Sequence, residues 1–222
     1  MTSVRQDIRY CLRGFRKQPG FVAMAVVALG LGIGSATAIF SVVENVLLEP
    51  FPYRQADRIV SVQVHDLKRS QPGGRGAYTT PEFMELRRQT HTLEDMVGIN
   101  NLDVLYTTRE GTERLQGVQV TANTFQFLGI APMRGRGLLP ADGKSGAAPV
   151  FAMSYKMWLK YCDRDPQVLG KTFLFNNEAR TLVGIMPPRF TYFGGDIWYP
   201  HDPDPGEPNA DRTYYFLQGR RK

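Results

Sequence analysis

The sequence predicts an α+β protein, with one N-terminal transmembrane helix followed by a mixed α+β domain outside the membrane. Three observations support this fold class. Residues 21–43 carry no charged side chain, and beyond residue 50 short strand patterns alternate with short helix patterns. The chain has 222 residues, of which 42% are apolar and 22% charged, so it can bury a sizeable core. Its two cysteines are too few for a disulfide scaffold.

The first 19 residues have the pattern of a basic amphipathic helix. Apolar side chains recur on one face from Val4 to Phe15, and cations recur on another face at the same spacing. Such a helix lies in the headgroup layer of a bilayer, although a merely solvated charged face would show the same pattern. We expect residues 1–19 to form an interfacial helix on the lipid bilayer. The candidate headgroup ligands are Arg5, Arg9, Arg13, Arg16 and Lys17.

Residues 20–48 are predicted to form the transmembrane helix. The uncharged run from Phe21 to Val43 would extend about 35 Å as a helix, enough to cross a hydrocarbon core of about 30 Å. Gly30 and Gly34 fit the small-xxx-small spacing at which helices approach closely in lipid, although glycines also occur in spans that do not pack. The candidate helix-packing residues are Ala28, Gly30, Gly32, Gly34 and Ala36.

A cleaved signal peptide is the main alternative to a retained anchor, because Ala36-Thr37-Ala38 matches the A-x-A cleavage pattern. Cleavage after Ala38 would release a secreted soluble binding domain. Two features favour the anchor: the 20 leading residues are long for the charged n-region of a signal peptide, and apolar residues continue to Leu48. The positive-inside rule then places the N-terminus in the cytoplasm and the residues after about 50 in the periplasm or outside the cell.

Residues 49–219 are predicted to form one external domain, followed by a basic C-terminal end at 220–222. Strand patterns are found at 58–65, 102–107, 114–121, 150–153, 171–175 and 180–185. Helix patterns begin at residue 80, where Thr80 is the expected N-cap and Pro81 the first helical residue, and cover 124–128 and 155–162. Asn176 and Asn177 predict a hairpin between the last two strands, and Gly129 is expected to end the second helix.

The charge distribution argues against a nucleic-acid partner. The net charge is +6, but the first 20 residues contribute +4 and the last three +3, which leaves −1 for residues 44–219. A nucleic-acid-binding protein needs a basic face on its folded body. We therefore expect no nucleic acid among the partners.

We find no constellation of catalytic or ligand-binding residues in the sequence. Gly143-Lys144-Ser145 resembles the end of a phosphate-binding loop, but the upstream glycine is displaced and Pro140 removes an amide donor. The three histidines are far apart, and the acidic stretch 201–211 lacks the spacing of a calcium loop. We expect no enzyme activity, no catalytic residue, no cofactor and no metal, and we place the aromatic residues of 190–199 in the core.

Several blocks of the sequence together resemble a known family. In chain order they are RQDIRYCLRGFRKQPGF, ALGLGIGSATAIFSVVENVLLEPFPY, RGRGLLPAD, APVFAMSYKMWLKY and DPQVLGKTFLFNNEARTLVGIMPPRF. Their order is similar to that in the N-terminal part of MacB/FtsX-type ABC transporter permeases, over residues from about 5 to 219. The first span and the last block are most similar to the duplicated orphan permeases, which have no fused ATPase.

The resemblance implies a first transmembrane helix and a MacB-like periplasmic core domain in the bacterial inner membrane. It implies a non-catalytic subunit of an efflux or mechanotransmission permease, driven by an ABC ATPase subunit in trans. It also implies dimerisation with a second copy or with a permease partner. Relatives continue into further membrane helices after the external domain, so we expect a truncated permease or a one-span partner protein. The transported substrate is not indicated.

Overall fold

The computed structural model describes residues 18–43, 52–65, 74–108 and 111–222. Contacts within the chain divide it into two compact units, Met1–Phe51 and Pro52–Lys222. The five cations of the predicted interfacial helix at 1–19 lie outside the described residues. The last part of the predicted span, residues 44–48, also lies outside them.

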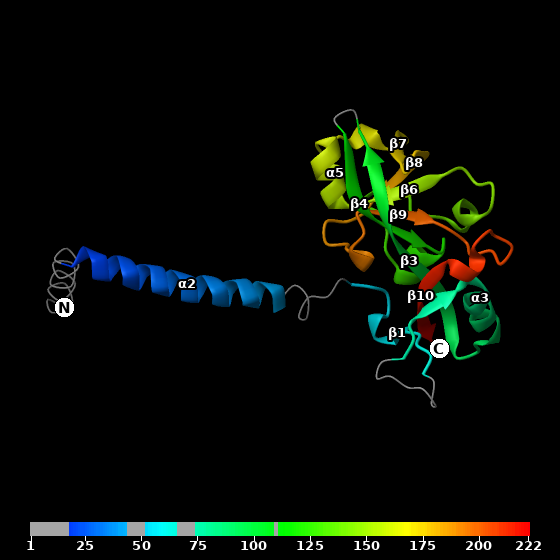
Figure 1. The fold of residues 1–222 in the computed structure, drawn as a ribbon, viewed down its shortest axis with the longest axis horizontal. Coiled ribbons are helices and arrows are strands. Elements are labelled where there is room, and N and C mark those ends of the chain that lie inside the picture. Colours follow the sequence, from blue (N-terminus) through cyan, green and yellow to red (C-terminus); the bar gives the residue numbers. More distant parts are fainter. Residues whose placement is uncertain (1–17, 44–51, 66–73, 109–110) are drawn as a thin grey trace. The chain divides into compact units, whose positions relative to one another are not determined.

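Helix α2 spans Pro19–Val43 and corresponds to the uncharged run (Figure 1). Proline suits its first position, where an N–H group would have no partner within the helix. Residues Pro19–Ser41 are long and apolar enough to cross a membrane. Ser35 Oγ donates to Gly32 O at 3.0 Å and Thr37 Oγ1 donates to Ile33 O at 2.8 Å. Both hydroxyl groups are thus satisfied inside the helix, as a lipid environment requires.

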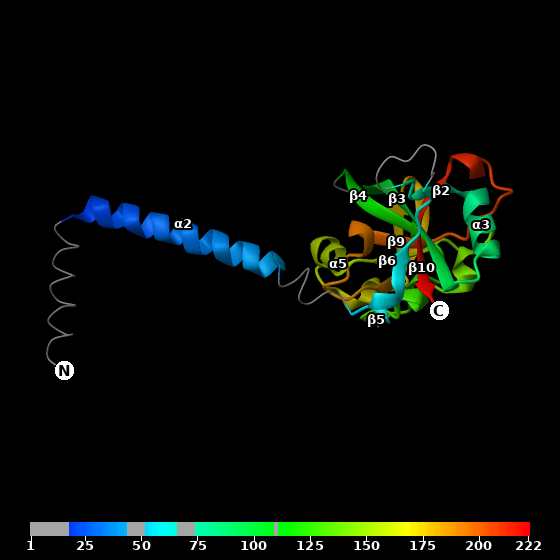
Figure 2. The same cartoon turned by 90° about the horizontal axis from the view of Figure 1, so that it is seen from below.

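The second unit is built on a ten-stranded sheet with short helices (Figures 1 and 2). The strands are β1 Ile59–Ser61, β2 Ala77–Thr79, β3 Leu93–Thr107, β4 Thr112–Val120, β5 Arg134–Gly135, β6 Val150–Met153, β7 Thr172–Phe175, β8 Glu178–Ile185, β9 Ile197–Pro200 and β10 Tyr214–Arg221. The α-helices are α3 Thr80–Gln89, α4 Thr124–Leu128 and α5 Tyr155–Cys162. The main path of the sheet is β1-β10-β3-β4-β9-β6-β8-β5, while β2 pairs with β10 and β7 pairs with β3 and β8.

Six of these strands close into a barrel. β3 pairs with β4, β4 with β9, β9 with β6, β6 with β8 and β8 with β7. β7 then returns to β3, where Tyr106 lies opposite Phe175. The main core joins these strands to α5, and its buried members are Val104, Leu115, Phe151, Met153, Met157, Trp158, Val168, Phe175, Leu182, Ile185, Ile197 and Tyr199. Closure satisfies the backbone groups of strands that would otherwise lie at an edge.

Beyond the barrel, the sheet continues through the first half of β3 into β10, β1 and β2. A second buried cluster joins α3 to this part, and its members are Tyr78, Phe83, Met96, Tyr215 and Leu217. Helix α3 begins with a capping box, in which Thr79 N donates to Glu82 Oε2 at 2.9 Å. The cap and the buried face together fix α3 against the sheet.

The predicted α+β class is confirmed, and so are most local elements. The strand β6 and the helices α4 and α5 have the predicted bounds. Asn176 and Asn177 have positive φ values of 49° and 62° in the hairpin between β7 and β8, and Gly129 ends α4 with a φ of 70°. Helix α3 begins at Thr80, and its N-cap is Thr79, one residue before the predicted cap. Of the aromatic residues in 190–199, Phe193 is only partly buried, and the others belong to the core.

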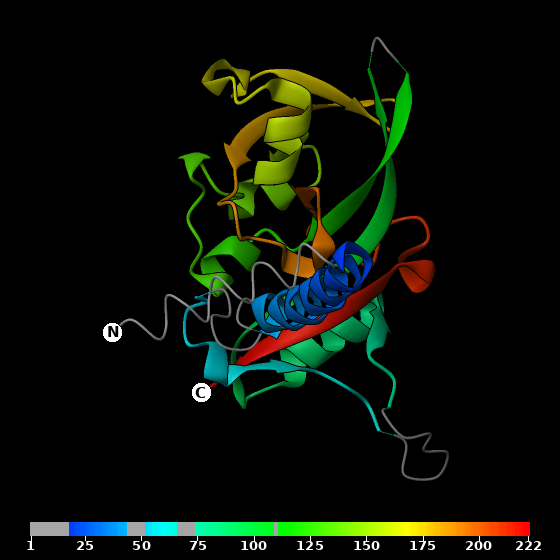
Figure 3. The same cartoon turned by 90° about the vertical axis from the view of Figure 1, so that its left-hand side faces the viewer.

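Long-range pairing accounts for the strands that differ from the predictions. β3 begins at Leu93, well before the predicted strand at 102–107, and neither β9 nor β10 is among the predicted strands. β10 includes Arg220 and Arg221, which the sequence analysis set apart as a basic end at 220–222. Figure 3 shows β10 in red alongside β1 in cyan, and pairing with β1, β2 and β3 is what makes this segment a strand.

Candidate functional site

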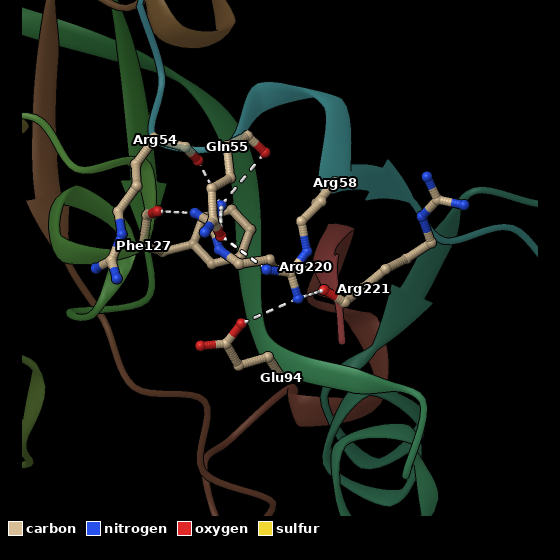
Figure 4. Close-up of polar contacts among 7 residues, drawn as sticks. All are labelled: Arg54, Gln55, Arg58, Glu94, Phe127, Arg220 and Arg221. Carbon is tan, nitrogen blue, oxygen red and sulfur yellow. Dashed lines mark hydrogen bonds and ion pairs between the residues drawn. The ribbon is translucent and has the colours of Figure 1, made fainter.

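The segment that begins the second unit and the strand that ends it lie side by side. β1 pairs antiparallel with β10, with Ile59 opposite Arg220, and Val62 N donates to Leu217 O at 3.0 Å. We call residues 52–58, which precede β1, the incoming segment. We call the set of contacts around the end of β10 the junction; its residues are Arg54, Gln55, Arg58, Glu94, Phe127, Arg220 and Arg221 (Figure 4).

A tight turn shapes the incoming segment. Gln55 lies in the left-handed region, with φ 50° and ψ 52°, and a short 3-10 turn at Ala56–Arg58 follows. Arg58 N donates to Gln55 O at 2.9 Å, and Arg54 N donates to Leu128 O at 2.9 Å. A non-glycine residue in this region carries strain of about 1 kcal/mol or more, so the surrounding contacts must hold the turn in place.

Helix α4 ends where the incoming segment passes. Gly129 follows the helix, and a Cβ atom built on it would lie 2.5 Å from Arg54 Cβ, so only glycine leaves room here. The last carbonyls of the helix, on Phe127 and Leu128, accept hydrogen bonds from the Arg220 side chain and from Arg54 N. The helix end carries partial negative charge, which the guanidinium group of Arg220 complements.

Arg220 is the one charged residue that is buried among the described residues, with 5% of its surface exposed. Its Nη1 donates to Arg54 O and, at 3.4 Å, to Gln55 O. Its Nη2 donates to Phe127 O, and its guanidinium carbon lies 4.8 Å from the centre of the Phe127 ring. Carbonyl oxygens and an aromatic face therefore stabilise this buried cation in place of a carboxylate.

Arg58 makes the reverse connection, from the incoming segment to the end of β10. Its Nη2 donates to Arg221 O, and its Nη1 donates to Gln55 Oε1 at 3.1 Å (Figure 4). Glu94, at the start of β3, lies 3.5 Å from Arg58 Nη2. Each of the two neighbouring segments thus contributes an arginine that binds backbone carbonyls of the other. The junction holds the incoming segment, α4 and two strands together through polar contacts.

A polar hollow of about 640 Å³ lies near the turn between β3 and β4. Glu113 Oε2 accepts hydrogen bonds from Lys160 Nζ at 2.5 Å and from Tyr161 Oη at 2.6 Å. These two bonds lower the pKa of Glu113 below its usual value. The three groups satisfy one another in a closed network. Among the described residues, here or elsewhere, no three His, Cys, Asp or Glu side chains come together as metal ligands.

None of the predicted site residues is among the residues of the junction. The candidate headgroup ligands Arg5, Arg9, Arg13, Arg16 and Lys17 lie outside the described residues. The candidate packing residues Ala28, Gly30, Gly32, Gly34 and Ala36 lie on α2, where a Cβ built on any of the three glycines would meet only open space. Helix packing therefore stays a prediction.

Sequence reasoning missed the junction. The available signal for β10 was the run from Tyr214 to Leu217, because aromatic residues favour strands.

A family model described as the MacB-like periplasmic core domain matches residues 22–220 of the chain. A comparison with curated proteins finds no match. Among solved structures, the extracellular domain of the noncanonic ABC-type transporter YknZ from Gram-positive bacteria has a TM-score of 0.53 and 12% identity. That alignment covers 74% of this chain and 83% of the YknZ chain.

Two further structures share the fold at a similar level. The periplasmic region of MacB from Actinobacillus actinomycetemcomitans has a TM-score of 0.52 and 10% identity, with 74% of each chain covered. A domain described as a permease protein of Porphyromonas gingivalis has a TM-score of 0.52 and 16% identity, with 77% of each chain covered. At these identities the likeness shows a shared fold.

Proposed function

Because the chain belongs to the family of the MacB-like periplasmic core domain, we propose that it is a non-catalytic membrane subunit of an ABC-type efflux or mechanotransmission permease. The observation that carries this proposal is the extent of the family match. The match begins inside α2 and runs through the external unit to Arg220 near the end of β10. It therefore includes the apolar helix as well as the folded domain.

The proposed topology has the N-terminus in the cytoplasm of a bacterial cell and residues 52–222 outside the inner membrane. Five cations precede α2, whereas Glu44 and Glu49 are the first charges after it. This asymmetry is the one that sets the orientation of a first membrane helix. The external unit would then pass motion between the membrane and partner proteins or substrate outside the membrane.

The proposed partners are an ABC ATPase subunit in trans and a second copy of the chain or another permease. The ATPase is proposed as a separate subunit because the first span and the last sequence block resemble the duplicated orphan permeases, which have no fused ATPase. For dimerisation, the spacing of Gly30 and Gly34 on α2 supports close helix contact.

Membrane fractionation and cysteine labelling test the anchor and its orientation. The tagged chain should stay in the membrane fraction after an alkaline carbonate wash. With both native cysteines replaced by serine, an impermeant maleimide should label a Lys156→Cys variant on intact cells or spheroplasts, because this side chain is exposed on α5. The matched Ser3→Cys variant should be labelled only after lysis. Labelling in the opposite order would refute the topology, and a mature protein beginning at Ile39 would favour the secreted binding domain instead.

Co-purification tests the partnership with an ATPase. The tagged chain, extracted from its own host in mild detergent, should retain a protein that carries a phosphate-binding loop and hydrolyses ATP. The chain purified alone should not hydrolyse ATP, and turnover by such material would contradict the non-catalytic role. A chain that resists carbonate but retains no ATPase would contradict the permease assignment and leave only a membrane-anchored domain.

A further inference from the structure

We propose that Arg220 is a positioning residue that fixes the incoming segment to the end of β10, so that a displacement of the incoming segment moves the external unit as one body. This role rests on the proposed function, in which motion passes between the membrane and the external unit. It concerns one side chain whose contacts join three segments distant in the sequence. Arg54 and Arg220 are 166 residues apart.

The described contacts of the incoming segment are mainly polar, and it buries little apolar surface. Ala56–Arg58 contributes no buried residue, and β1 contains three residues, none of which is fully buried. Tyr53 packs edge-on against Phe190 and Tyr192, with ring centres 6.5 and 6.2 Å apart. Segments with few buried apolar contacts open at low free-energy cost. The hydrogen bonds of Arg220, together with those of Arg54 N and Arg58, are therefore a large part of what holds this segment.

The geometry of the junction requires a guanidinium group. Its planar fork donates in two directions at once, to Arg54 O and to Phe127 O, while its face covers the Phe127 ring. An ammonium group has neither the fork nor the flat face. A buried cation is costly unless acceptors surround it, and here the acceptors come from the incoming segment and from α4. Arg220 can make all these contacts only when the incoming segment, α4 and β10 are in place together.

Hydrogen exchange on the full chain in lipid nanodiscs provides the first test. In an Arg220→Met variant, the amides of Arg54 and Val62 should exchange about tenfold faster or more, because their acceptors lie across the junction. Amides of β6, inside the barrel, should exchange at the wild-type rate. The control is Arg87→Met, which removes the same charge from an exposed side chain on α3, outside the junction, and should leave all these rates unchanged.

Distance measurements between spin labels give a readout that a general loss of stability would not produce. Both native cysteines are replaced by serine, and one pair of labels is attached at Asp57→Cys in the incoming segment and Lys156→Cys on α5. A reference pair is attached at Arg87→Cys on α3 and Lys156→Cys. All three positions are exposed. We expect both distance distributions to be narrow in the wild type. In Arg220→Met only the 57–156 distribution should broaden.

Each outcome of these experiments decides the proposal. Faster exchange and a broader 57–156 distance, with an unchanged reference pair, support the positioning role. Unchanged values overturn it, and so does a general change at both pairs, because Arg220 would then hold the whole fold. If Arg220→Met does not fold, Arg220→Lys replaces it, with the same pattern expected at smaller amplitude. These results are independent of the ATPase, so failure to find that partner would refute the proposed function without changing this readout.

Discussion

Replacing Gly129 by alanine should loosen the junction without touching any of its charged groups. Gly129 has a φ of 70°, and an added Cβ would lie 2.5 Å from Arg54 Cβ, with Arg54 Cγ and Cδ at 3.4 Å. A Cβ–Cβ contact offers no rotation that relieves it, because both atoms are attached directly to backbone. The incoming segment must therefore move away from α4, which breaks the bond from Arg54 N to Leu128 O at 2.9 Å.

The expected cost of Gly129→Ala has two parts. Alanine in the left-handed region costs about 1–2 kcal/mol, and the lost backbone hydrogen bond costs about 1 kcal/mol more. Residual strain from the contact adds to this, so the free energy of unfolding should fall by about 2–4 kcal/mol. Gly146 is the matched control, because it has a φ of 80° and a Cβ there would meet nothing within 4 Å. Gly146→Ala should cost only the first part, about 1–2 kcal/mol.

Intrinsic tryptophan fluorescence in urea gives both free energies on the full chain. The sequence has two tryptophans, and Trp158 and Trp198 are both buried in the external unit, so the signal reports that unit and not α2. The effect of glycine on the unfolded chain is common to both variants and cancels in the comparison. Equal losses for Gly129→Ala and Gly146→Ala would refute the contact with Arg54.

Three other predictions concern the cap of α3, the cap of α5 and the glycines of α2. A paired arginine and the cap hydrogen bond lower the pKa of Glu82 from 4.5 to about 2. Its ion pair therefore stabilises the fold fully above pH 4.5, and this stabilisation is lost as pH falls from 4.5 toward 2. Glu82→Gln should flatten this part of the stability profile measured by fluorescence. Ser154→Ala removes the N-cap of α5 and should lower the free energy of unfolding by about 1 kcal/mol. Isoleucine at Gly30 and Gly34 should weaken self-association in a membrane two-hybrid assay, whereas Val27→Ile should not.

Local signals explain why much of the fold could be predicted from the sequence. Ser154 Oγ accepts a hydrogen bond from Met157 N at 3.1 Å, so the start of α5 is set by residues three apart. The same holds for the turn at Asn176 and Asn177, whose positive φ values suit asparagine, and for Gly129 at the end of α4. Elements of this kind do not depend on which distant strand lies beside them.

The junction could not be predicted because its physics is long-range. Arginine is rarely buried, so three basic residues at the end of a sequence indicate an exposed charged end. Arg220 is nevertheless buried, because carbonyls of Arg54 and Phe127, 166 and 93 residues away, supply its acceptors. β10 is likewise a strand because β1, β2 and β3 pair with it. No local pattern in the sequence contains these partners.

The length of β3 connects the junction to the barrel. Near its start Asp95 lies opposite Arg220, and near its end Tyr106 lies opposite Phe175 where the barrel closes. Its 15 residues would extend about 50 Å at the usual rise of about 3.3 Å per residue. One continuous strand thus links both places, and pairing with β4 from Ile99 to Thr107 stiffens the half nearer the barrel. Under the proposed function, motion applied at the junction would reach the barrel through β3, which is why loosening Arg220 should uncouple the incoming segment while leaving the barrel folded.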